Sequence, residues 1–525
     1  SYIARPIKRL ESAPQHVLGV FRMVAGKGRI EPTDRRIRTE FVVPPGMENK
    51  AGTGDLVSAR ALGSRSFGLP EARVVEVIGD ASSARAPSLI AIHTHDIPTD
   101  FSRAAVDAAE AAKPVTPDGR TDLRQVPLLT IDGSDARDFD DAVWAEPDTD
   151  PANRGGWNLI VAIADVAWYV RPGSALDKDA YDRGNSVYFP DRVVPMLPET
   201  LSNGLCSLVP GEDRGCLAAR MKIDGDGNLR SHSFVRGIMK SAARLTYEQV
   251  EAAWTGSPDD VTGPLVETVI TPLYGAFKVL LAARKRRGAI DLELPERRVE
   301  LDANSEIVGI HPVERLDSHR LIEEFMITAN VAAAETLERQ DAPCMYRVHD
   351  QPSQEKVEGL RETLAGIGIR FAKGQVVKPE LFQGIVAGVE GKPEAHMVSM
   401  AVLRAQSQAE YSPANLGHFG LALRRYAHFT SPIRRYSDLL VHRSLIASLG
   451  LGPDGLRPED EDAFPAYGKH ISFTERRAVD AERDAVDRYT TIFMSSQVGA
   501  SFAARINGVH RAGMFVTLDD TGADG

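Results

Sequence analysis

The sequence predicts an α+β protein in which a central region of mixed strands and helices is flanked by small all-β barrels. Three observations lead to this prediction. Residues 16–78 contain short β-prone runs separated by Gly, Pro and Asp, which is the pattern of a small barrel. Residues 121–495 mix strand-like and helix-like patterns without regular βαβ alternation, which favours a mixed or antiparallel sheet. Residues 498–518 are β-prone again, like the first strands of a second barrel.

We therefore divide the chain into four parts. They are a first barrel of the OB-fold type (1–82), a linker with a short helix (83–120), the central α+β domain (121–495) and the start of an incomplete second barrel (496–525). Hydrophobic periodicity predicts the longer helices over 265–286, 317–339, 353–366, 394–410, 432–448 and 469–494.

Charge is distributed unevenly along the chain. The 525 residues carry a net charge of −11, yet residues 1–75 contain 13 Lys and Arg against 7 Asp and Glu. Basic residues crowd the first half of the predicted barrel: Lys27, Arg29, Arg35, Arg36 and Arg38. A basic module on an acidic body favours capture of a polyanion, with a merely solvated basic face as the alternative. Phe21 and Phe41 are expected in the barrel core, with base stacking as the alternative.

The three cysteines have no metal-site spacing and are too few for a disulfide scaffold. They indicate a reducing compartment, so we expect a cytoplasmic protein. No apolar run is expected to span a membrane: the best, 159–170, is interrupted by Asp165. The start has no signal-peptide pattern. The chain opens with Ser and stops in an acidic turn, so we expect a protein truncated at both ends.

The most informative segment is an acidic loop, 132–141, in which five of ten residues are Asp. Clustered carboxylates raise one another's pKa, and a hard divalent cation removes that penalty. In an extended segment Asp138 and Asp140 project from one face and Asp141 from the other, while Asp132 ends the preceding apolar strand. We therefore predict a Mg²⁺ site, or a Mn²⁺ site, because the two ions share ligands and geometry.

Most acidic loops are solvated turns, and that is the alternative interpretation. The position of this loop at the end of a buried strand, where loops carry function, argues against it. An EF-hand is excluded because its ligand pattern, glycine and terminal Glu are missing. A second acidic segment, 224–228, has Leu229 and Val235 where an EF-hand needs Gly and Glu, so we expect a hairpin turn there.

The second informative segment is 426–438, where Ser431 and Pro432 precede Arg434 and Arg435. A serine cap followed by proline indicates a helix start, whose free N–H groups suit a phosphate. Arginine in a first helical turn is unfavourable without an anion, so we expect a phosphate or the acidic loop beside it. A surface helix with incidental basic residues is the alternative. Acids together with a phosphate-binding arginine predict metal-assisted phosphodiester cleavage.

These two segments resemble the sequence motifs of a known family. Residues 130–142 are similar to the metal motif of the RNase II superfamily, whose catalytic unit is the RNB domain, and 426–443 resemble its second signature. Three further segments also match, at 186–198, 202–208 and 346–350. Residues 133–137 are most similar to the ribonuclease R branch of the family. The resemblance implies that the first barrel is a cold-shock domain and that 496–525 begin an RNA-binding barrel.

The resemblance implies a processive hydrolytic 3′-to-5′ exoribonuclease that threads the 3′ end of single-stranded RNA and releases nucleoside 5′-monophosphates. It leaves open whether structured RNA is also degraded. It implies Asp140 and Arg434 as catalytic residues. It implies that the metal is held by Asp132, Asp138, Asp140 and Asp141. The RNA-binding residues that it implies are Tyr188, Tyr247, Leu292, Glu324, Arg347, His349, Ser431 and Arg435. Among these, Tyr188 matches the aromatic that stacks near the RNA 3′ end.

One residue departs from the family pattern. Leu292 stands where most members have a phenylalanine that clamps the terminal bases, so the clamp, the length of the end product and the grip on RNA are left open. Two alternative functions stay open: a catalytically weak RNA-binding homologue, and a metal-dependent endonuclease or phosphatase. The first predicts erosion of the acidic motif, yet all four motif aspartates and Arg434 are present.

Overall fold

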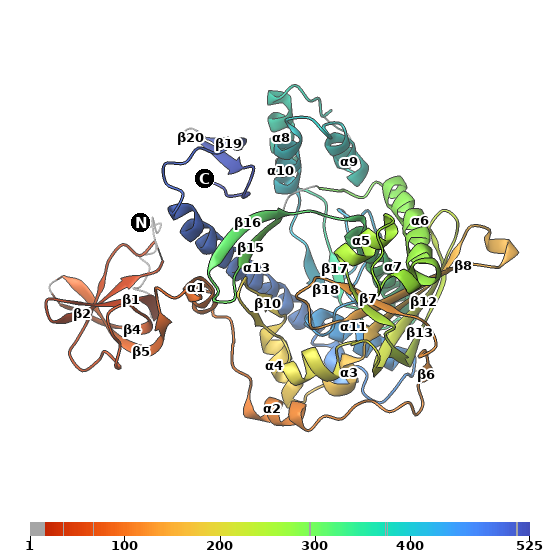
Figure 1. Cartoon of the computed structure of the whole chain (residues 1–525), viewed down its shortest axis with the longest axis horizontal. Helices are drawn as coiled ribbons and strands as arrows, with labels where there is room; N and C mark the ends of the chain where they lie inside the picture. Colours follow the sequence, from red (N-terminus) through yellow and green to blue (C-terminus); the bar gives the residue numbers. More distant parts are fainter. Residues whose placement is uncertain are drawn as a thin grey trace, which may run out of the picture.

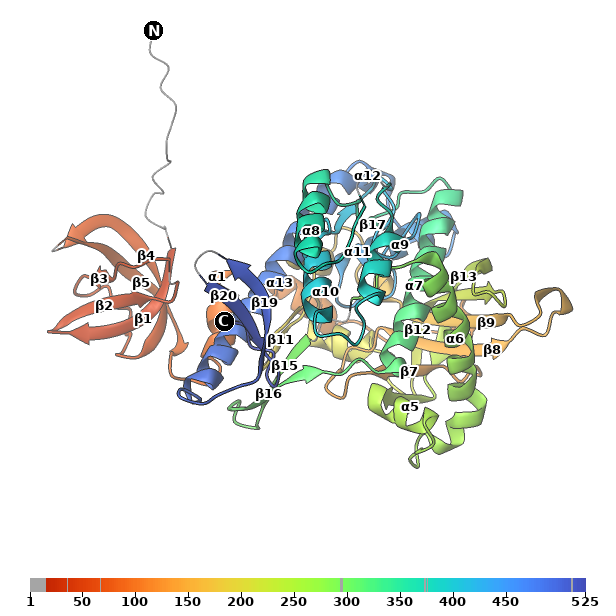
Figure 2. The ribbon, with the colours of Figure 1, turned by 90° about the horizontal axis from the view of Figure 1, so that it is seen from above.

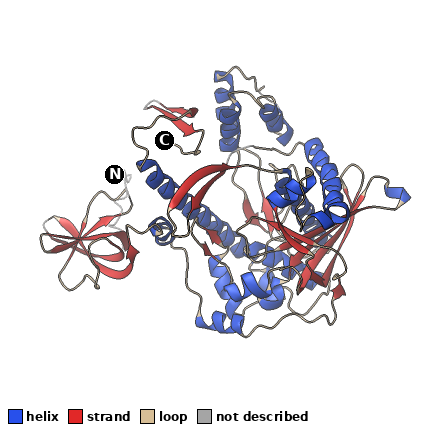
Figure 3. Cartoon of the chain, viewed as in Figure 1, coloured by secondary structure: helices blue, strands red, loops and turns tan. Residues whose placement is uncertain are grey.

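A computed structural model of the chain describes residues 16–525 except 35, 67, 293–295, 373, 375 and 511–512. Arg35, one of the basic residues named above, therefore lies outside the described residues. Figure 1 shows a small barrel, at the left, joined through α1 (Ala86–Thr94) to a larger body of strands and helices. The secondary-structure colouring in Figure 3 shows helices around a central sheet, so the predicted α+β class is confirmed.

The first barrel closes in the strand order β1-β2-β3-β5-β4. Its strands are β1 (His16–Val24), β2 (Lys27–Pro32), β3 (Phe41–Val43), β4 (Asp55–Ser66) and β5 (Leu69–Asp80). Phe21 and Phe41 are buried in its core, so their predicted core position is confirmed and base stacking by them is wrong. Gly28 lets β2 pass close to Phe21, because a Cβ there would lie 2.8 Å from the ring.

The body is built on a seven-stranded sheet with the order β14-β7-β8-β9-β12-β13-β6. The strands are β6 (Thr121–Asp122), β7 (Leu129–Asp132), β8 (Asp141–Pro147), β9 (Trp157–Ala164), β12 (Asp213–Ile223), β13 (Leu229–Lys240) and β14 (Ala243–Thr246). Strands β14 and β6 pair in parallel with β7 and β13, and the other pairings are antiparallel. The acidic loop connects β7 to β8. Residues 224–228 form the predicted hairpin turn between β12 and β13.

Helices cover this sheet and extend from it toward the barrel. Helices α6 (Thr271–Arg287) and α7 (Asp317–Arg339) pack on its strands, and α11 (Tyr436–Ser448) packs on α7. The long helix α13 (Phe464–Ser495) runs from the body toward the barrel, where α1 packs on it, as Figures 1 and 2 show. Smaller helices are α2 (Arg103–Glu110), α3 (Val166–Tyr169), α4 (Ala175–Arg183), α5 (Tyr247–Trp254) and α12 (Pro458–Glu461).

A helical group and four two-stranded sheets lie outside the seven-stranded sheet. Helices α8 (Gln354–Gly366), α9 (Pro379–Ala387) and α10 (Ala395–Ala405) enclose an apolar cluster of their own. Three of these sheets are hairpins: β10 (Val187–Tyr188) with β11 (Val193–Val194), β15 (Glu296–Leu301) with β16 (Ile307–Val313), and β19 (Ala504–His510) with β20 (Gly513–Leu518). The fourth pairs β17 (Tyr346–Val348) with β18 (Glu410–Ser412), which lie on either side of the helical group in the sequence. The last hairpin lies in the segment predicted to begin a second barrel, and that barrel stays a prediction.

The structure corrects three helix predictions. Helix α11 begins at Tyr436 rather than 432, because the side chain of Asp438 binds Arg435 and the Ser431 N–H and shapes a turn before the helix. The helix predicted over 394–410 ends at Ala405, because Gln406 is extended and the chain then enters β18. The region 83–120 contains two helices, α1 and α2, rather than one. By contrast, α7 has the predicted bounds.

One helical segment, 263–287, is long and apolar enough to cross a membrane by those two criteria, with a mean hydropathy of 1.5. This contradicts the expectation that no segment reaches that length. The segment contributes Leu273, Phe277 and Leu280 to the main core, and it ends in four consecutive basic residues, 284–287. Its apolar face is therefore occupied by the sheet. All three cysteines are free and buried.

Candidate active site

The acidic loop is fixed by its contacts with the segment before β12. Phe139 is buried, and its N–H donates a hydrogen bond to Ser207 Oγ at 3.0 Å. The Ser207 hydroxyl in turn donates to the carbonyl of Arg137 at 2.8 Å. These contacts turn the chain between β7 and β8, so that Asp132 ends one strand and Asp141 begins the next. The loop is therefore not a solvated turn.

The acidic loop and the arginine segment meet in space, although 293 residues separate them. The N–H of Ile433 donates to Asp140 Oδ1 at 2.9 Å, and Arg434 Nε lies 3.8 Å from Asp140 Oδ2. Arg434 Nη2 donates to Ser431 Oγ at 3.1 Å, while its side chain stays 43% exposed. The structure thus brings Asp140 and Arg434 together as predicted. The free N–H of the turn therefore donates its hydrogen bond to a carboxylate rather than to a phosphate.

Burial makes these carboxyl groups weak acids in the absence of a cation. Burial and the charge of Asp138 raise the pKa of Asp132 to about 6. Burial raises the pKa of Asp140 well above its usual value, although Arg434 opposes the shift. Burial and Asp132 do the same to Asp141. Ionising all of them together is therefore costly unless positive charge is added.

The donor set fits a divalent cation. The Oδ2 atoms of Asp132, Asp140 and Asp141 are buried and accept no hydrogen bond. Within the described ranges, no group of three or more His, Cys, Asp or Glu side chains is arranged to hold a metal ion. Three carboxylate oxygens that lack partners and lie between facing strand ends are nevertheless the ligands that hard cations prefer. A bound cation lowers the pKa of such groups, because metal binding releases their protons.

Two tyrosines border an open cavity of about 900 Å³ beside the acids. The Tyr188 hydroxyl donates to Asp138 Oδ2 at 3.0 Å, and its backbone N–H donates to Glu482 Oε1 at 2.7 Å. Tyr188 as a whole residue remains 39% exposed, so its side chain is accessible from the cavity that it lines. Tyr247 stacks on His319 with the ring centroids 4.0 Å apart. Burial and the nearby aspartates raise the pKa of both tyrosines, so both hydroxyls stay protonated.

The backbone couples Tyr188 to the arginine turn. The Ser186 N–H donates to the Arg434 carbonyl at 3.0 Å, and the Tyr436 N–H donates to the Gly184 carbonyl at 2.9 Å. Tyr188 follows this short paired segment by two residues. The cavity wall that carries Tyr188 and the turn that carries Arg434 are therefore one structural unit.

The structure directs several other predicted RNA-binding side chains into internal contacts. Arg435 binds both carboxylate oxygens of Asp438, at 2.8 and 2.7 Å. Arg347 pairs with Glu475 at 2.6 Å. The ring nitrogens of His349 contact the Ser407 carbonyl and the Gly420 N–H, both at 2.9 Å. Ser431 is buried at the arginine turn. RNA contact by this group stays a prediction.

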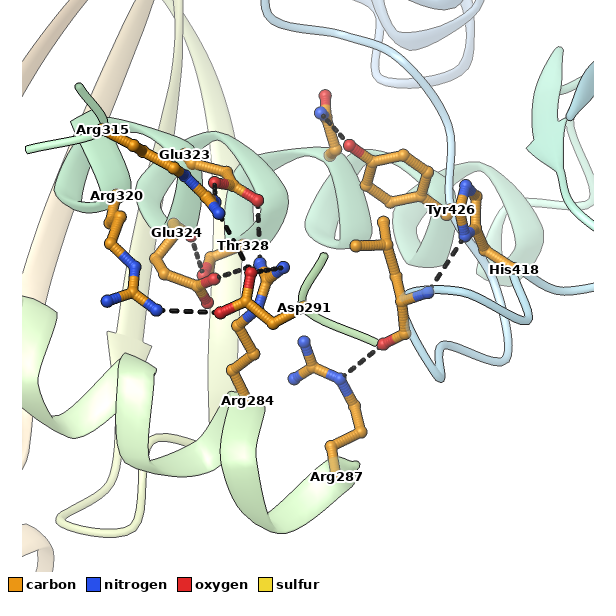
Figure 4. A network of polar contacts seen from close by, with 12 residues as sticks. Arg284, Arg287, Asp291, Arg315, Arg320, Glu323, Glu324, Thr328, His418 and Tyr426 are labelled. Atoms are coloured by element: carbon orange, nitrogen blue, oxygen red, sulfur yellow. Dashed lines mark hydrogen bonds and ion pairs between the residues drawn. The ribbon is translucent and has the colours of Figure 1, made fainter. Parts of the chain in front are cut away.

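Glu324 and Leu292 are also engaged in internal contacts. Glu324 is 3% exposed and pairs with Arg284 at 2.7 Å inside the network of Figure 4. Leu292 packs against the apolar cluster of α8, α9 and α10. The described residues give it a packing role, and its place in a base clamp stays a prediction.

Sequence reasoning missed Glu482 and Arg244. Glu482 on α13 holds the backbone of Tyr188. Arg244 on β14 donates to the Gly133 carbonyl at 2.6 Å, and its charge opposes the rise in the pKa of Asp132. No local signal marks either residue, because α13 carries many acids and β14 is an ordinary strand.

Comparison with known proteins agrees with this arrangement. The family model described as the RNB domain matches residues 120–450, and a cold-shock domain model matches 30–102. Ribonuclease R of Vibrio parahaemolyticus is 42% identical over 540 residues, covering 99% of this chain and 64% of that protein. The chain thus spans less than two thirds of that relative.

Solved structures give the same result. Mycoplasma genitalium RNase R in complex with ribose-methylated single-stranded RNA superposes with a TM-score of 0.91 at 26% identity, covering 99% of this chain and 82% of that one. Its complex with double-stranded RNA gives the same TM-score and identity, with 99% and 93% coverage. The RNB match covers more than half of the chain, and the acids and arginine of both signatures converge as described. The chain therefore belongs to the RNB-domain family, and its most similar relatives include bacterial ribonuclease R.

Proposed function

We propose that this chain is the catalytic part of a hydrolytic 3′-to-5′ exoribonuclease that degrades RNA processively to nucleoside 5′-monophosphates with Mg²⁺ or Mn²⁺. One observation carries the proposal: Asp140, buried among acids whose oxygens lack hydrogen bonds, lies 3.8 Å from an exposed arginine, and Tyr188, which is bonded to the same acidic loop, lines an open cavity. The ribonuclease R relatives support RNA as the substrate. The free, buried cysteines support a cytoplasmic location.

Each residue of the site has a role in this mechanism. Asp132, Asp138, Asp140 and Asp141 would hold the divalent ions. Such ions activate a water molecule and neutralise the leaving oxygen. The half-exposed guanidinium of Arg434 is placed to stabilise the charge that develops on the scissile phosphate. Tyr188 offers its exposed ring to the terminal base, which suits a processive enzyme because every base has a π-face.

The test uses RNA labelled internally along its length, as a linear strand and as a closed circle. With Mg²⁺ we expect mononucleotide release from the linear strand and an intact circle, because the enzyme requires a free 3′ end. Cleavage of the circle would identify an endonuclease instead. RNA binding without any hydrolysis in Mg²⁺ or Mn²⁺ would identify the non-catalytic homologue.

The Asp140→Asn variant tests the residue that carries the proposal. It keeps the shape of the side chain and an acceptor for the Ile433 N–H, but it removes the charge. We expect hydrolysis to fall by at least about 10³-fold while RNA affinity is retained. Asp150→Asn, on the exposed turn at the other end of β8 from Asp141, is the matched control and should hydrolyse RNA like the parent.

A further inference from the structure

One aspartate of the acidic loop, Asp135, has no part in the proposed metal site. Its side chain is 75% exposed, and its Oδ2 accepts a hydrogen bond from Arg298 Nη2 at 3.1 Å. Arg298 lies on the hairpin formed by β15 and β16, which we call the β15–β16 arm. Both residues line the 900 Å³ cavity together with Tyr188 and Tyr247. An exposed ion pair therefore joins the acidic loop to the arm across the mouth of the cavity.

The arm is anchored at its base, so Arg298 starts from a fixed position. Asp291, just before the arm, pairs with Arg315, just after it, at 2.9 Å, and with Arg320 on α7 at 2.8 Å. Figure 4 shows these contacts converging on the Asp291 carboxylate. Arg284 adds ion pairs to Glu323 and Glu324 on the same helix, at 2.8 and 2.7 Å. This network ties both ends of the arm to α6 and α7.

One face of the arm packs on α13. Val299 and Ile310 are buried against Tyr489, and Arg297 lies 3.7 Å from Asp487. Alternate residues of a strand face opposite sides, so Arg298, which is 58% exposed, points away from α13. The arm is therefore not a free lid. The long side chain of Arg298 is its movable part.

We propose that Arg298 is a contact for the RNA backbone at the cavity mouth and that Asp135 occupies the place of a phosphate until the strand arrives. This inference rests on the proposed function. A guanidinium binds carboxylate and phosphate in the same planar, two-pronged geometry, so one anion can replace the other. An exposed ion pair is weak, so a phosphate displaces Asp135 readily. RNA entry then depends on Asp135, which lies in the same loop as the proposed metal ligands but is not one of them.

Binding measured without cleavage tests this exchange. We would follow the fluorescence anisotropy of a labelled single-stranded RNA in EDTA, from about 50 to 300 mM salt. Arg298→Gln should weaken binding about three- to tenfold and reduce the slope of log affinity against log salt by about 0.7. Asp135→Asn should act in the opposite direction, with binding about two- to fivefold tighter at low salt, because the competing anion is gone. The double variant should behave like Arg298→Gln, because Asp135 acts through Arg298.

An exposed pair on α2 supplies the matched control. Arg103 and Asp107 lie 2.8 Å apart, and Arg103→Gln and Asp107→Asn change the net charge by the same amounts. At moderate salt we expect both controls to bind RNA within about 1.5-fold of the parent, because distant exposed charges are screened.

The outcomes separate the inference from the function on which it rests. A parent protein that binds no RNA in EDTA would overturn the proposed function and the inference together. If the parent binds RNA but Asp135→Asn binds it more weakly or equally well, the inference alone would be overturned. The ion pair would then only hold the arm against the acidic loop. Unchanged RNA affinity and an unchanged salt slope in Arg298→Gln would likewise overturn the inference and leave the proposed function standing.

Discussion

The backbone N–H of Ile433 donates a hydrogen bond to Asp140 Oδ1 across 2.9 Å. This contact joins the loop between β7 and β8 to the turn before α11, which are remote in sequence. It orients the most buried acid of the site and leaves the second oxygen of Asp140 unpartnered. It also places the neighbouring residue, Arg434, with its guanidinium partly exposed at the site. The proposed metal-binding and phosphate-binding halves of the site are therefore aligned by one backbone donor.

In the absence of divalent ions, the stability of the folded protein should fall as the pH rises from about 4 to above 6. The pKa of Asp132 is about 6 in the folded protein and near 3.8 in the unfolded chain, so the folded state holds the extra proton in this range. Each rise in pH then favours unfolding. Asp132→Asn removes this group, so in EDTA we expect the variant to equal the parent near pH 4 and to exceed its Tm at pH 7.

Thermal unfolding monitored by circular dichroism checks this prediction. Adding Mg²⁺ should raise the Tm of the parent more at pH 7 than at pH 5, because the ligands must be deprotonated to bind the ion. The ion should raise the Tm of Asp132→Asn less. An Asp132→Asn protein that is no more stable than the parent at pH 7 in EDTA would show that Asp132 is not held as a weak acid.

Tyr188 should act through its ring rather than its hydroxyl. Tyr188→Phe loses the hydrogen bond to Asp138 but keeps the stacking face, so we expect the parental end product and a rate within about fivefold. Tyr188→Ala loses stacking worth about 1–3 kcal/mol, so RNA should be released earlier and the end product should be longer. Denaturing gels of digested, end-labelled RNA measure both results. End products of equal length from Tyr188→Ala and the parent would contradict the stacking role.

The proximity of Asp140 and Arg434 could be predicted from the sequence. Clustered acids are stabilised by nearby positive charge, and arginines at a helix start are stabilised by a nearby anion. The bounds of α7 followed from its apolar period. The start of α11 did not, because Ser431 and Pro432 form a local helix-start pattern that the Asp438 side chain overrides. Glu482 could not be selected among the acids of α13, because only the tertiary fold places it against Tyr188.

Arg236 should be essential for stability although it lies outside the site. It pairs with Asp165 at 2.7 Å and with Asp454 at 2.6 Å, and both carboxylates have 0% side-chain exposure. In Arg236→Met, Arg120 still pairs with Asp165, but Asp454 loses both of its hydrogen bonds to the guanidinium. We expect a loss of about 3–5 kcal/mol in the free energy of unfolding.

Urea unfolding followed by tryptophan fluorescence measures this loss. The control, Arg103→Met at the exposed pair on α2, should change the free energy by less than about 1 kcal/mol. A similar small change in Arg236→Met would mean that Asp454 is hydrated in solution.

Leu292 should stabilise the α8–α10 group rather than set the length of the RNA product. Its side chain packs against the apolar cluster that includes Leu360 and Phe382, and it is only partly buried there. Leu292→Ala should therefore cost about 1–2 kcal/mol, less than a fully buried leucine. Faster hydrogen exchange confined to residues 354–405 would report this loss, with an unchanged end product. Leu292→Phe adds volume at the edge of a filled cluster and should also keep the parental end product. A shorter or longer product from Leu292→Phe would instead place residue 292 at the RNA terminus, as the family resemblance implies.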